Sequence, residues 1–211
     1  VMTQAPEVLA LHLPPIPDTW ESYLDHLWAL DRPKATDEDR ERTALYQAQR
    51  QRAAAEQTAP TLDAFLETLA IRVRMAPMAD HELPRAAQLT QRTNQFNLST
   101  RRRNEAEMKA LSAQANTWCW TVRVVDRFGD YGLVGVIVTE RTGDDLHLDT
   151  LLLSCRVLGR RVEYALLHGL AEFAKEQGCT SLVAEYRATP KNPPILGFLQ
   201  QSGWQECGEQ P

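Results

Sequence analysis

Cys155 combines the residue type and the sequence position that nucleophilic chemistry needs. It lies in the segment 149–160, between a predicted strand and a predicted helix. Three arginines follow it closely, at Arg156, Arg160 and Arg161. The first amides of a helix are unpaired and attract anions, and together with nearby arginines they favour the thiolate form of a cysteine. The pattern predicts a nucleophile beside an anion site, but a small core cysteine at the end of a strand fits it equally well.

Two side chains that precede Cys155 could act as its general base. His147 and Asp149 are each an even number of residues away from it, so an extended strand that continued to Cys155 would place all three on one face. We rank Asp149 above His147, because a histidine that follows Asp144 and Asp145 is more often a solvated turn residue.

Two further segments carry side chains that could bind a polar or anionic substrate. Lys191 and Asn192 follow the C-terminal end of a predicted strand, where open α/β sheets bind ligands, although a helix cap would explain Asn192 by itself. Asn94 and Asn97 lie in the segment 91–100, which is rich in amides and hydroxyls. Such residues bind polar ligands or, more commonly, hold loops in place.

The first half of the chain is predicted to be mostly helical. Eight of the twelve prolines lie at or before Pro84 and all ten glycines lie at or beyond Gly129, so two kinds of architecture are joined. Apolar periodicity and capping residues define the elements. Helices are expected at 18–29, 36–52, 61–69, 83–93 and from Asn104, and strands at 8–13 and 71–75. The basic run 101–103 is most simply a solvated turn.

From Thr117 the apolar period changes to two, which predicts half-buried strands. Trp118 and Trp120 fall on one face of the first of them. The elements expected from here are a three-strand meander at 117–153, a helix at 162–177, a strand at 181–186, a final helix from Asn192 to Gly203 and a last short strand. This order predicts an α/β domain in which antiparallel strands lead into one crossover.

Composition places the chain among ordinary globular proteins. It has 211 residues, of which 43% are hydrophobic and 24% charged, and a formal net charge of −5. This acidic balance argues against a nucleic-acid partner, and the absence of an apolar run of about 20 residues argues against a membrane helix. We therefore expect a soluble, cytoplasmic protein. The cysteines and histidines show no metal-ligand spacing, so no metal site is predicted.

Four groups of residues in this chain match the motifs of one protein family. They are 88–98 with Arg102, 126–132, 154–160 with Glu163, and Thr189 with Lys191 and Asn192. Together they resemble the FkbH-like glyceryl transferases, which join a haloacid-dehalogenase-like phosphatase region to a GNAT-like acyltransferase region. A weaker likeness extends back to Pro6, so the resemblance covers nearly the whole chain.

The resemblance implies a fold and two regions. Residues 81–211 would form a GNAT-like acyltransferase domain, an α/β fold with a mixed sheet and crossover helices. Residues 1–80 would be a mostly helical linker and the C-terminal remainder of the haloacid-dehalogenase-like domain. The family's Asp-x-Asp phosphatase motif does not precede Pro6, so we expect this chain to be a fragment whose phosphatase region is missing.

The resemblance also implies a reaction. A glyceryl or phosphoglyceryl unit would pass from 1,3-bisphosphoglycerate to a thioester on Cys155, and then to the phosphopantetheine thiol of an acyl carrier protein in polyketide biosynthesis. Arg156, Gly159 and Arg160 would hold phosphate or carboxylate oxygens. The other implied substrate-binding residues are Asn94, Asn97, Thr189, Lys191 and Asn192. The acyl carrier protein would be the partner, and this chain would carry no cofactor of its own.

One departure from the family pattern bears on the choice between competing functions. Coenzyme A-binding GNAT loops read Arg/Gln-x-x-Gly-x-Gly/Ala, whereas this chain has Arg161 at the last, small position. An arginine there can pair with the single phosphate of a carrier protein's phosphopantetheine, so it favours a carrier protein over coenzyme A. Two alternatives stay open: a coenzyme A-dependent GNAT N-acyltransferase without a covalent stage, and a non-catalytic module that docks a carrier protein.

Overall fold

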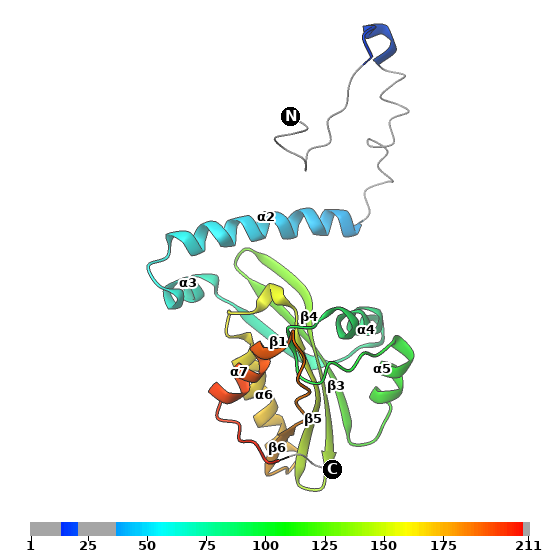
Figure 1. Cartoon of the computed structure of the whole chain (residues 1–211), viewed down its shortest axis with the longest axis vertical. Helices are drawn as coiled ribbons and strands as arrows, with labels where there is room; N and C mark the ends of the chain where they lie inside the picture. Colours follow the sequence, from blue (N-terminus) through cyan, green and yellow to red (C-terminus); the bar gives the residue numbers. More distant parts are fainter. Residues whose placement is uncertain (1–13, 21–36, 209–211) are drawn as a thin grey trace. The chain divides into compact units, whose positions relative to one another are not determined.

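The structure, a computed structural model, describes residues 14–20 and 37–208 (Figure 1). The chain forms two compact units that divide between Ala44 and Leu45. In the first unit a short 3₁₀ helix, η1 (Pro17–Thr19), precedes Trp20, whose indole Nε1 donates to the Pro14 carbonyl at 2.8 Å. The strand predicted at 8–13 lies outside the described residues, as does most of the helix predicted at 18–29.

A six-stranded mixed sheet organises the second unit. Its strands are β1 (Arg72–Pro77), β2 (Phe96–Asn97), β3 (Thr117–Asp126), β4 (Gly129–Thr142), β5 (Asp145–Leu153) and β6 (Ser181–Ala184). The order is β1-β3-β4-β5, with antiparallel pairs, and the other edge of β5 is shared by β2 and β6. Only the β5–β6 pair is parallel. The predicted meander and crossover are therefore confirmed.

The described residues form six α-helices. They are α2 (Asp37–Thr58), which crosses the boundary between the units, α3 (Leu62–Leu69), α4 (Leu83–Arg92), α5 (Glu105–Ser112), α6 (Val162–Glu176) and α7 (Pro193–Gln201). Figure 1 shows α6 and α7 on one face and α4 and α5 on the other. Each face has its own buried apolar core, one that includes Leu166 and Leu170 and one that includes Leu89 and Met108. No helix in the described part of the chain is long and apolar enough to cross a membrane.

Capping chemistry starts two helices where the sequence predicted. At the start of α3, Thr61 Oγ1 accepts from the Ala64 amide at 3.2 Å. At the start of α5, Asn104 and Glu107 form a reciprocal capping box, with N–H···O distances of 2.7 and 2.9 Å. Each cap satisfies amides that have no partner within the helix, so the local sequence alone specifies where these helices begin.

Several predicted bounds differ from the structure. Helix α2 continues to Thr58, beyond the predicted end at residue 52, and β6 ends at Ala184. No strand forms in the described residues after Gly203. Strand β2 lies in the segment 91–100, which was expected to be a connector. It has only two residues, too few for any periodicity to reveal.

The predicted boundary at residues 80 and 81 does not separate two units. Strand β1 pairs with β3 over its whole length, from Arg72 opposite Val125 to Pro77 opposite Trp120. Residues 72–77 therefore belong to the same sheet as the predicted acyltransferase domain, and the second unit begins as early as Leu45.

A buried ion pair holds α2 against the turn between β3 and β4. Arg52 donates to Asp126 through Nε at 2.6 Å and Nη2 at 2.9 Å, and both side chains are almost fully buried. Asp126 also accepts from the Tyr131 hydroxyl at 2.7 Å and from the Phe128 and Gly129 amides. A charge removed from water needs such partners, and here every partner is supplied by the chain itself.

These contacts predict an acid-dependent loss of stability. Burial by itself would raise the pKa of Asp126, but the hydrogen bonds from Arg52, Tyr131 and the Phe128 amide bring it below its ordinary value of 3.8. Stabilisation by a carboxylate with a lowered pKa is complete above the ordinary value and is lost as the pH falls through the folded-state pKa. In urea unfolding, the advantage of the wild type over Asp126→Asn should be largest at neutral pH and shrink toward about pH 3. An advantage that stayed constant with pH would contradict this account.

Candidate functional site

Cys155 lies at the surface, directly after the strand that the sequence predicted to present it. Strand β5 ends at Leu153, and Cys155 begins a 3₁₀ helix, η3 (Cys155–Val157). The Ser154 amide donates to the Val134 carbonyl at 2.7 Å, which ties the start of this segment to the neighbouring strand. The Cys155 side chain is exposed. We call residues 154–161 the 154–161 loop.

The second half of the 154–161 loop contains amides that have no backbone partner. Gly159 and Arg161 are both left-handed, with φ of 72° and 59°, and Val162 begins α6 directly after them. A left-handed residue next to a right-handed one aims successive N–H groups at one concave side, which suits an anion. Within the described residues, no backbone carbonyl accepts from the amides of 159–162. These amides and the start of a 15-residue helix form a surface complementary to a phosphate.

Arginines without carboxylate partners surround the loop. Arg160 Nη1 donates to the Arg156 carbonyl at 2.7 Å, and Arg156 Nε lies 3.4 Å from Ser154 Oγ. Arg85 of α4 lies near enough to Arg156 for their like charges to interact. Burial lowers its pKa, and the like charges of Arg156 and Arg92 lower it further. Among the described residues none of these four arginines forms a salt bridge. Their mutual repulsion would be relieved by a bound anion.

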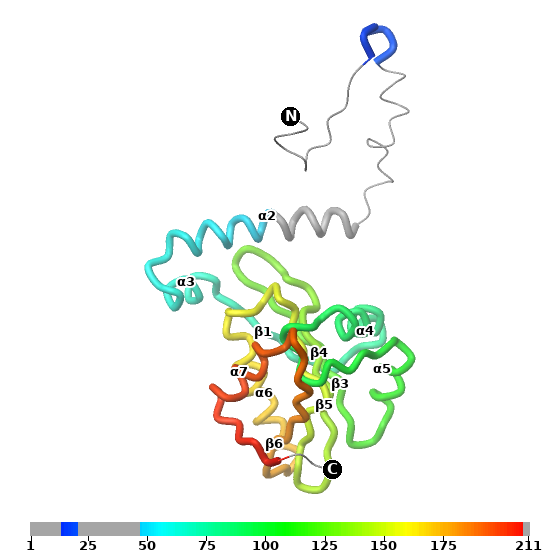
Figure 2. The backbone as a smooth tube through the Cα atoms, in the orientation of Figure 1, coloured from blue at the N-terminus to red at the C-terminus, as the bar shows by residue number. Residues whose placement is uncertain are grey.

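Arg161, by contrast, directs its charge away from the loop. Its guanidinium pairs with Asp63 of α3, and both side chains are exposed. Figure 2 shows the loop after β5, the turn between β3 and β4, and α3 at the same end of the sheet. We expected Arg161 to pair with a bound phosphate, but in the structure its guanidinium pairs with Asp63 instead.

His147 is too far from Cys155 to act as its base. It lies within β5, opposite Glu140 of β4 and Val183 of β6. Leu153 is six positions further along the same strand, which at about 3.3 Å per residue is roughly 20 Å. At this distance His147 cannot take a proton from Cys155 directly, so its predicted role as a base for Cys155 does not fit the structure. The histidine is a half-buried strand residue and not part of the loop.

Asp149 interrupts the alternation on which the shared-face prediction depended. The register passes from Leu148 opposite Thr139 to Thr150 opposite Val138, so Asp149 has no partner on β4. Such a bulge moves the residues after it to the other face. Leu148 and Leu151 accordingly share the core under α6, although they differ by an odd number of residues. Parity along β5 therefore cannot place His147, Asp149 and Cys155 together.

The carboxylate of Asp149 is occupied by arginines rather than by the cysteine. Arg103 Nη2 donates to it at 2.6 Å, and Arg101 Nη1 also pairs with it. Arg101 bridges onward to Glu185, which follows β6, at 2.6 Å. Residues 101–103 are therefore not a solvated turn, as the sequence suggested. Asp149 lies in a salt-bridge network, and its carboxylate contacts Arg101 and Arg103 rather than Cys155.

A short segment fills the gap between β5 and β6. Strand β6 pairs with β5 only from Asp145 to Leu148. Beyond that point β2 takes over, and the Leu98 amide donates to the Leu151 carbonyl at 3.0 Å. On its other side, the Leu98 carbonyl accepts from the Arg187 amide at 3.0 Å. We call residues 96–98 the strap, because they join the two diverging strands.

Asn192 and Asn97 hold the strap in place. Asn192 is fully buried, and its Nδ2 donates to the carbonyls of Asn97 and Arg187, both at 2.9 Å. Its Oδ1 accepts from the Thr189 amide and hydroxyl at 2.7 and 2.9 Å. Asn97 is also fully buried, and its amide group bonds to Thr93 and Thr100. Both N–H donors of the Asn192 side chain are used within the chain, and the fully buried Asn97 side chain bonds to its own loop, so both asparagines hold the strap rather than face a substrate.

The other predicted substrate-binding residues are more accessible. Lys191 is exposed and Thr189 half-buried, next to Asn192. Asn94 is half-buried, and its Oδ1 accepts from Arg102 Nη2 at 3.3 Å. Lys191 has no side-chain contact among the described residues, which leaves its ammonium group available at this end of the sheet.

A cavity of about 260 Å³ lies elsewhere, between β1, β3 and the segment 79–82. Arg74 and Arg123 face each other across the two strands there. Glu82 neutralises Arg123 through a salt bridge of 3.0 Å. This cavity shares no lining residue with the 154–161 loop, so the chemistry argued for Cys155 does not use it.

Sequence reasoning missed three participants near the loop. Arg85 lies on α4, and Tyr131 and Arg52 form the buried group beside Arg160. One signal points to such a group, because a buried strand that ends in Asp126 needs a cation from elsewhere in the chain, but it does not identify Arg52 or Tyr131.

The sequence matches no protein-family model, and a comparison with curated proteins found no relative. Several solved structures have a similar fold. A transcriptional regulator from Bacillus halodurans C-125 is 15% identical with a TM-score of 0.51, over 66% of this chain and 97% of its own. A ribosomal-protein-alanine N-acetyltransferase from Brucella melitensis biovar Abortus 2308 is 15% identical with a TM-score of 0.52, over 67% and 96%.

A third similar structure is AAC(6')-Iy, an aminoglycoside N-acetyltransferase, in complex with the bisubstrate analogue CoA-S-monomethyl-acetylneamine. It is 12% identical with a TM-score of 0.51, over 66% of this chain and 95% of its own. At these identities the likeness concerns the fold alone. The chain has a GNAT-like α/β fold, as the sequence predicted.

Proposed function

We propose that this chain transfers an acyl group from a phosphopantetheine thioester, such as an acyl-coenzyme A, and that the 154–161 loop binds the phosphate end of that donor. One observation carries the proposal. The amides of 159–162 have no backbone partner in the described residues, Arg156 and Arg160 lie in the same loop, and Arg85 of α4 is close enough to Arg156 to repel its charge. Within the described residues none of these three arginines forms a salt bridge.

The GNAT-like fold supports a coenzyme A donor over the other donors considered. Two of the similar folds are N-acetyltransferases, and one was solved with a coenzyme A-derived analogue. In such a reaction a nucleophilic acceptor attacks the thioester carbonyl carbon, the carbon–sulfur bond breaks, and the pantetheine thiolate leaves and takes up a proton. The contribution of the loop is to hold the donor, which removes translational and rotational freedom before the chemical step.

Binding of acetyl-coenzyme A, measured by titration calorimetry, tests this proposal. Arg160→Gln should weaken binding about 10- to 100-fold, since hydrogen bonds to charged groups contribute roughly 1.5–3 kcal/mol. Arg141→Gln is the matched control, because Arg141 lies at the opposite end of β4 and donates to the Gly143 carbonyl. Equal effects of the two substitutions, or a wild type that binds no acetyl-coenzyme A, would rule the proposal out.

A second candidate is the covalent route that the FkbH-like resemblance implies. The observation that favours it is the exposed thiol of Cys155 at the first residue of η3, next to Arg156. The thiolate would attack the carbonyl carbon of 1,3-bisphosphoglycerate, the bond to the phosphate oxygen would break, and inorganic phosphate would leave. The thioester formed on Cys155 would be a 3-phosphoglyceryl thioester, and hydrolysis of its phosphate ester by the haloacid-dehalogenase-like phosphatase would consume water and release a second inorganic phosphate. The phosphopantetheine thiol of an acyl carrier protein would then attack the glyceryl thioester carbonyl and release the Cys155 thiol.

Intact-mass spectrometry separates this route from direct transfer. The chain would be incubated with 1,3-bisphosphoglycerate and a haloacid-dehalogenase-like phosphatase of the kind the resemblance pairs with it. A glyceryl adduct should appear on the wild type and on Cys207→Ala, which removes the other exposed cysteine, and should be absent from Cys155→Ala. An adduct on Cys155→Ala would eliminate the covalent role. A chain that binds the carrier protein but forms no adduct and turns over no acyl donor would be a docking module.

A further inference from the structure

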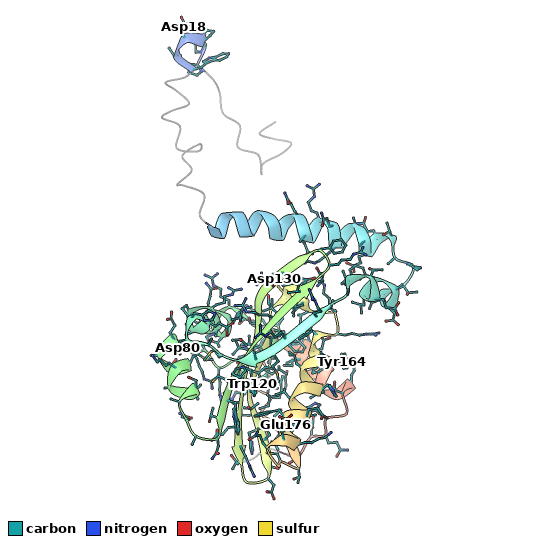
Figure 3. All side chains as sticks on the ribbon, turned by 180° about the vertical axis from the view of Figure 1, so that it is seen from behind. Asp18, Asp80, Trp120, Asp130, Tyr164 and Glu176 are labelled. Carbon is teal, nitrogen blue, oxygen red and sulfur yellow. The ribbon has the colours of Figure 1, made fainter. Side chains whose placement is uncertain are left out.

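We propose that Tyr131 is a positioning residue for the phosphate site, and that it acts by holding the guanidinium group of Arg160 in place. This inference rests on the proposed function and assigns a role to the buried ion pair between α2 and the turn of β3 and β4. Figure 3 labels Asp130, which marks this turn, Tyr164 at the start of α6, and Glu176 at its opposite end.

Tyr131 is fixed more firmly than an ordinary strand residue. Its side chain is 2% exposed, and its hydroxyl donates to Asp126 Oδ2 at 2.7 Å. The Arg52 guanidinium carbon lies 3.8 Å from the centre of the Tyr131 ring, and Arg52 is itself held by two hydrogen bonds to Asp126. The ring can therefore not rotate or shift without breaking its hydrogen bond to Asp126 and its contact with Arg52.

Arg160 uses this ring as a support. Its guanidinium carbon lies 5.5 Å from the ring centre, within the range of a cation–π contact. Its Nη1 donates to the Arg156 carbonyl, and within the described residues Nε and Nη2 donate to no protein atom. The guanidinium is thus oriented by the ring and by one carbonyl. Its Nε is buried, and Nη2 is the donor that stays available for a ligand.

The charge balance of the group explains why Arg160 can lie so close to a second arginine. Asp126 neutralises Arg52, so the ring lies between a neutral ion pair and the cation of the loop. A free arginine side chain loses considerable rotamer freedom when it binds an anion. A guanidinium that is already oriented loses less, and the difference appears as tighter phosphate binding. Helix α2 would in this way contribute to affinity without contacting the ligand.

Titration calorimetry with phosphopantetheine and with pantetheine tests this role. The dissociation constant of pantetheine divided by that of phosphopantetheine isolates the contribution of the phosphate. Tyr131→Leu should lower this ratio about fivefold, the size of one cation–π contact, and should leave pantetheine binding unchanged. Tyr131→Phe keeps the ring and should keep the ratio, although loss of the hydroxyl makes it less stable. Phe173→Leu, near the opposite end of α6, is the matched control and should change neither quantity.

Two results would overturn the inference. One is an unchanged ratio in Tyr131→Leu. The other is a ratio that falls as far in Tyr131→Phe as in Tyr131→Leu, because the hydrogen bond to Asp126, and not the ring, would then be what supports phosphate binding. Tyr131→Met supplies the same comparison if the leucine variant does not fold. A wild type that binds the two compounds equally would instead refute the proposed phosphate site itself, so the two failures are distinguishable.

Discussion

Replacing Arg52 with methionine should lower the free energy of unfolding by about 3–5 kcal/mol, the usual cost of removing one partner of a buried ion pair. The reason is the state in which Asp126 is left. Its side chain is fully buried, and without Arg52 only the Tyr131 hydroxyl and two backbone amides still bond to it. These neutral donors do not balance a charge that has been removed from water.

Urea unfolding followed by tryptophan fluorescence measures this change. Lys175→Met is the matched control, because it removes a cation from the exposed pair of Lys175 and Glu172. Exposed pairs contribute about 0–1 kcal/mol, so the control should unfold close to the wild type. If Arg52→Met were no more destabilising than Lys175→Met, the ion pair would not hold α2 against the sheet in solution.

Asn192→Ala should cost about 2–4 kcal/mol of folding free energy, because each buried polar group left without a partner costs roughly 1–3 kcal/mol. The substitution would remove the hydrogen-bond partner of the carbonyls of Asn97 and Arg187 and of the amide of Thr189. These groups lie where the strap joins the segment after β6. We therefore expect the strap to loosen before the rest of the sheet unfolds, which hydrogen exchange of the Leu98 amide would report.

Lys191→Ala is the control that separates scaffold from ligand binding. Lys191 is the exposed neighbour of Asn192, and its replacement should change stability by less than about 0.5 kcal/mol. Should Asn192→Ala prove as stable as the wild type and yet lose phosphopantetheine binding, Asn192 would contact the ligand, as its sequence position first suggested. The structure instead predicts that Asn192→Ala lowers stability because Asn192 holds the strap and does not contact the ligand.

Local patterns in the sequence specify much of the fold. The period-two runs after Thr117 give the meander, and the caps at Thr61 and Asn104 give the starts of α3 and α5. Each of these signals involves neighbouring residues only. The GNAT-like fold followed from this order of elements together with the motif resemblance, and the solved structures with similar folds bear it out.

The contacts that build the site are of another kind. Arg52 and Asp126 are 74 positions apart, and Arg101 and Asp149 are 48 apart. A single sequence shows that a buried Asp needs a cation, but it does not show which arginine supplies it. The bulge at Asp149 is equally hidden, because it depends on how β5 registers against β4 and not on the residues of β5 alone. For this reason the strand-face argument for His147 and Asp149 failed, while the placement of Cys155 next to the loop arginines held.

The most direct test of the phosphate site is a crystal structure of the chain with coenzyme A bound. The account predicts that oxygens of the diphosphate lie within hydrogen-bond distance of the amides of 159–162 and of the Arg160 guanidinium. A diphosphate bound in the cavity between β1 and β3, or at any place other than the start of α6, would contradict it.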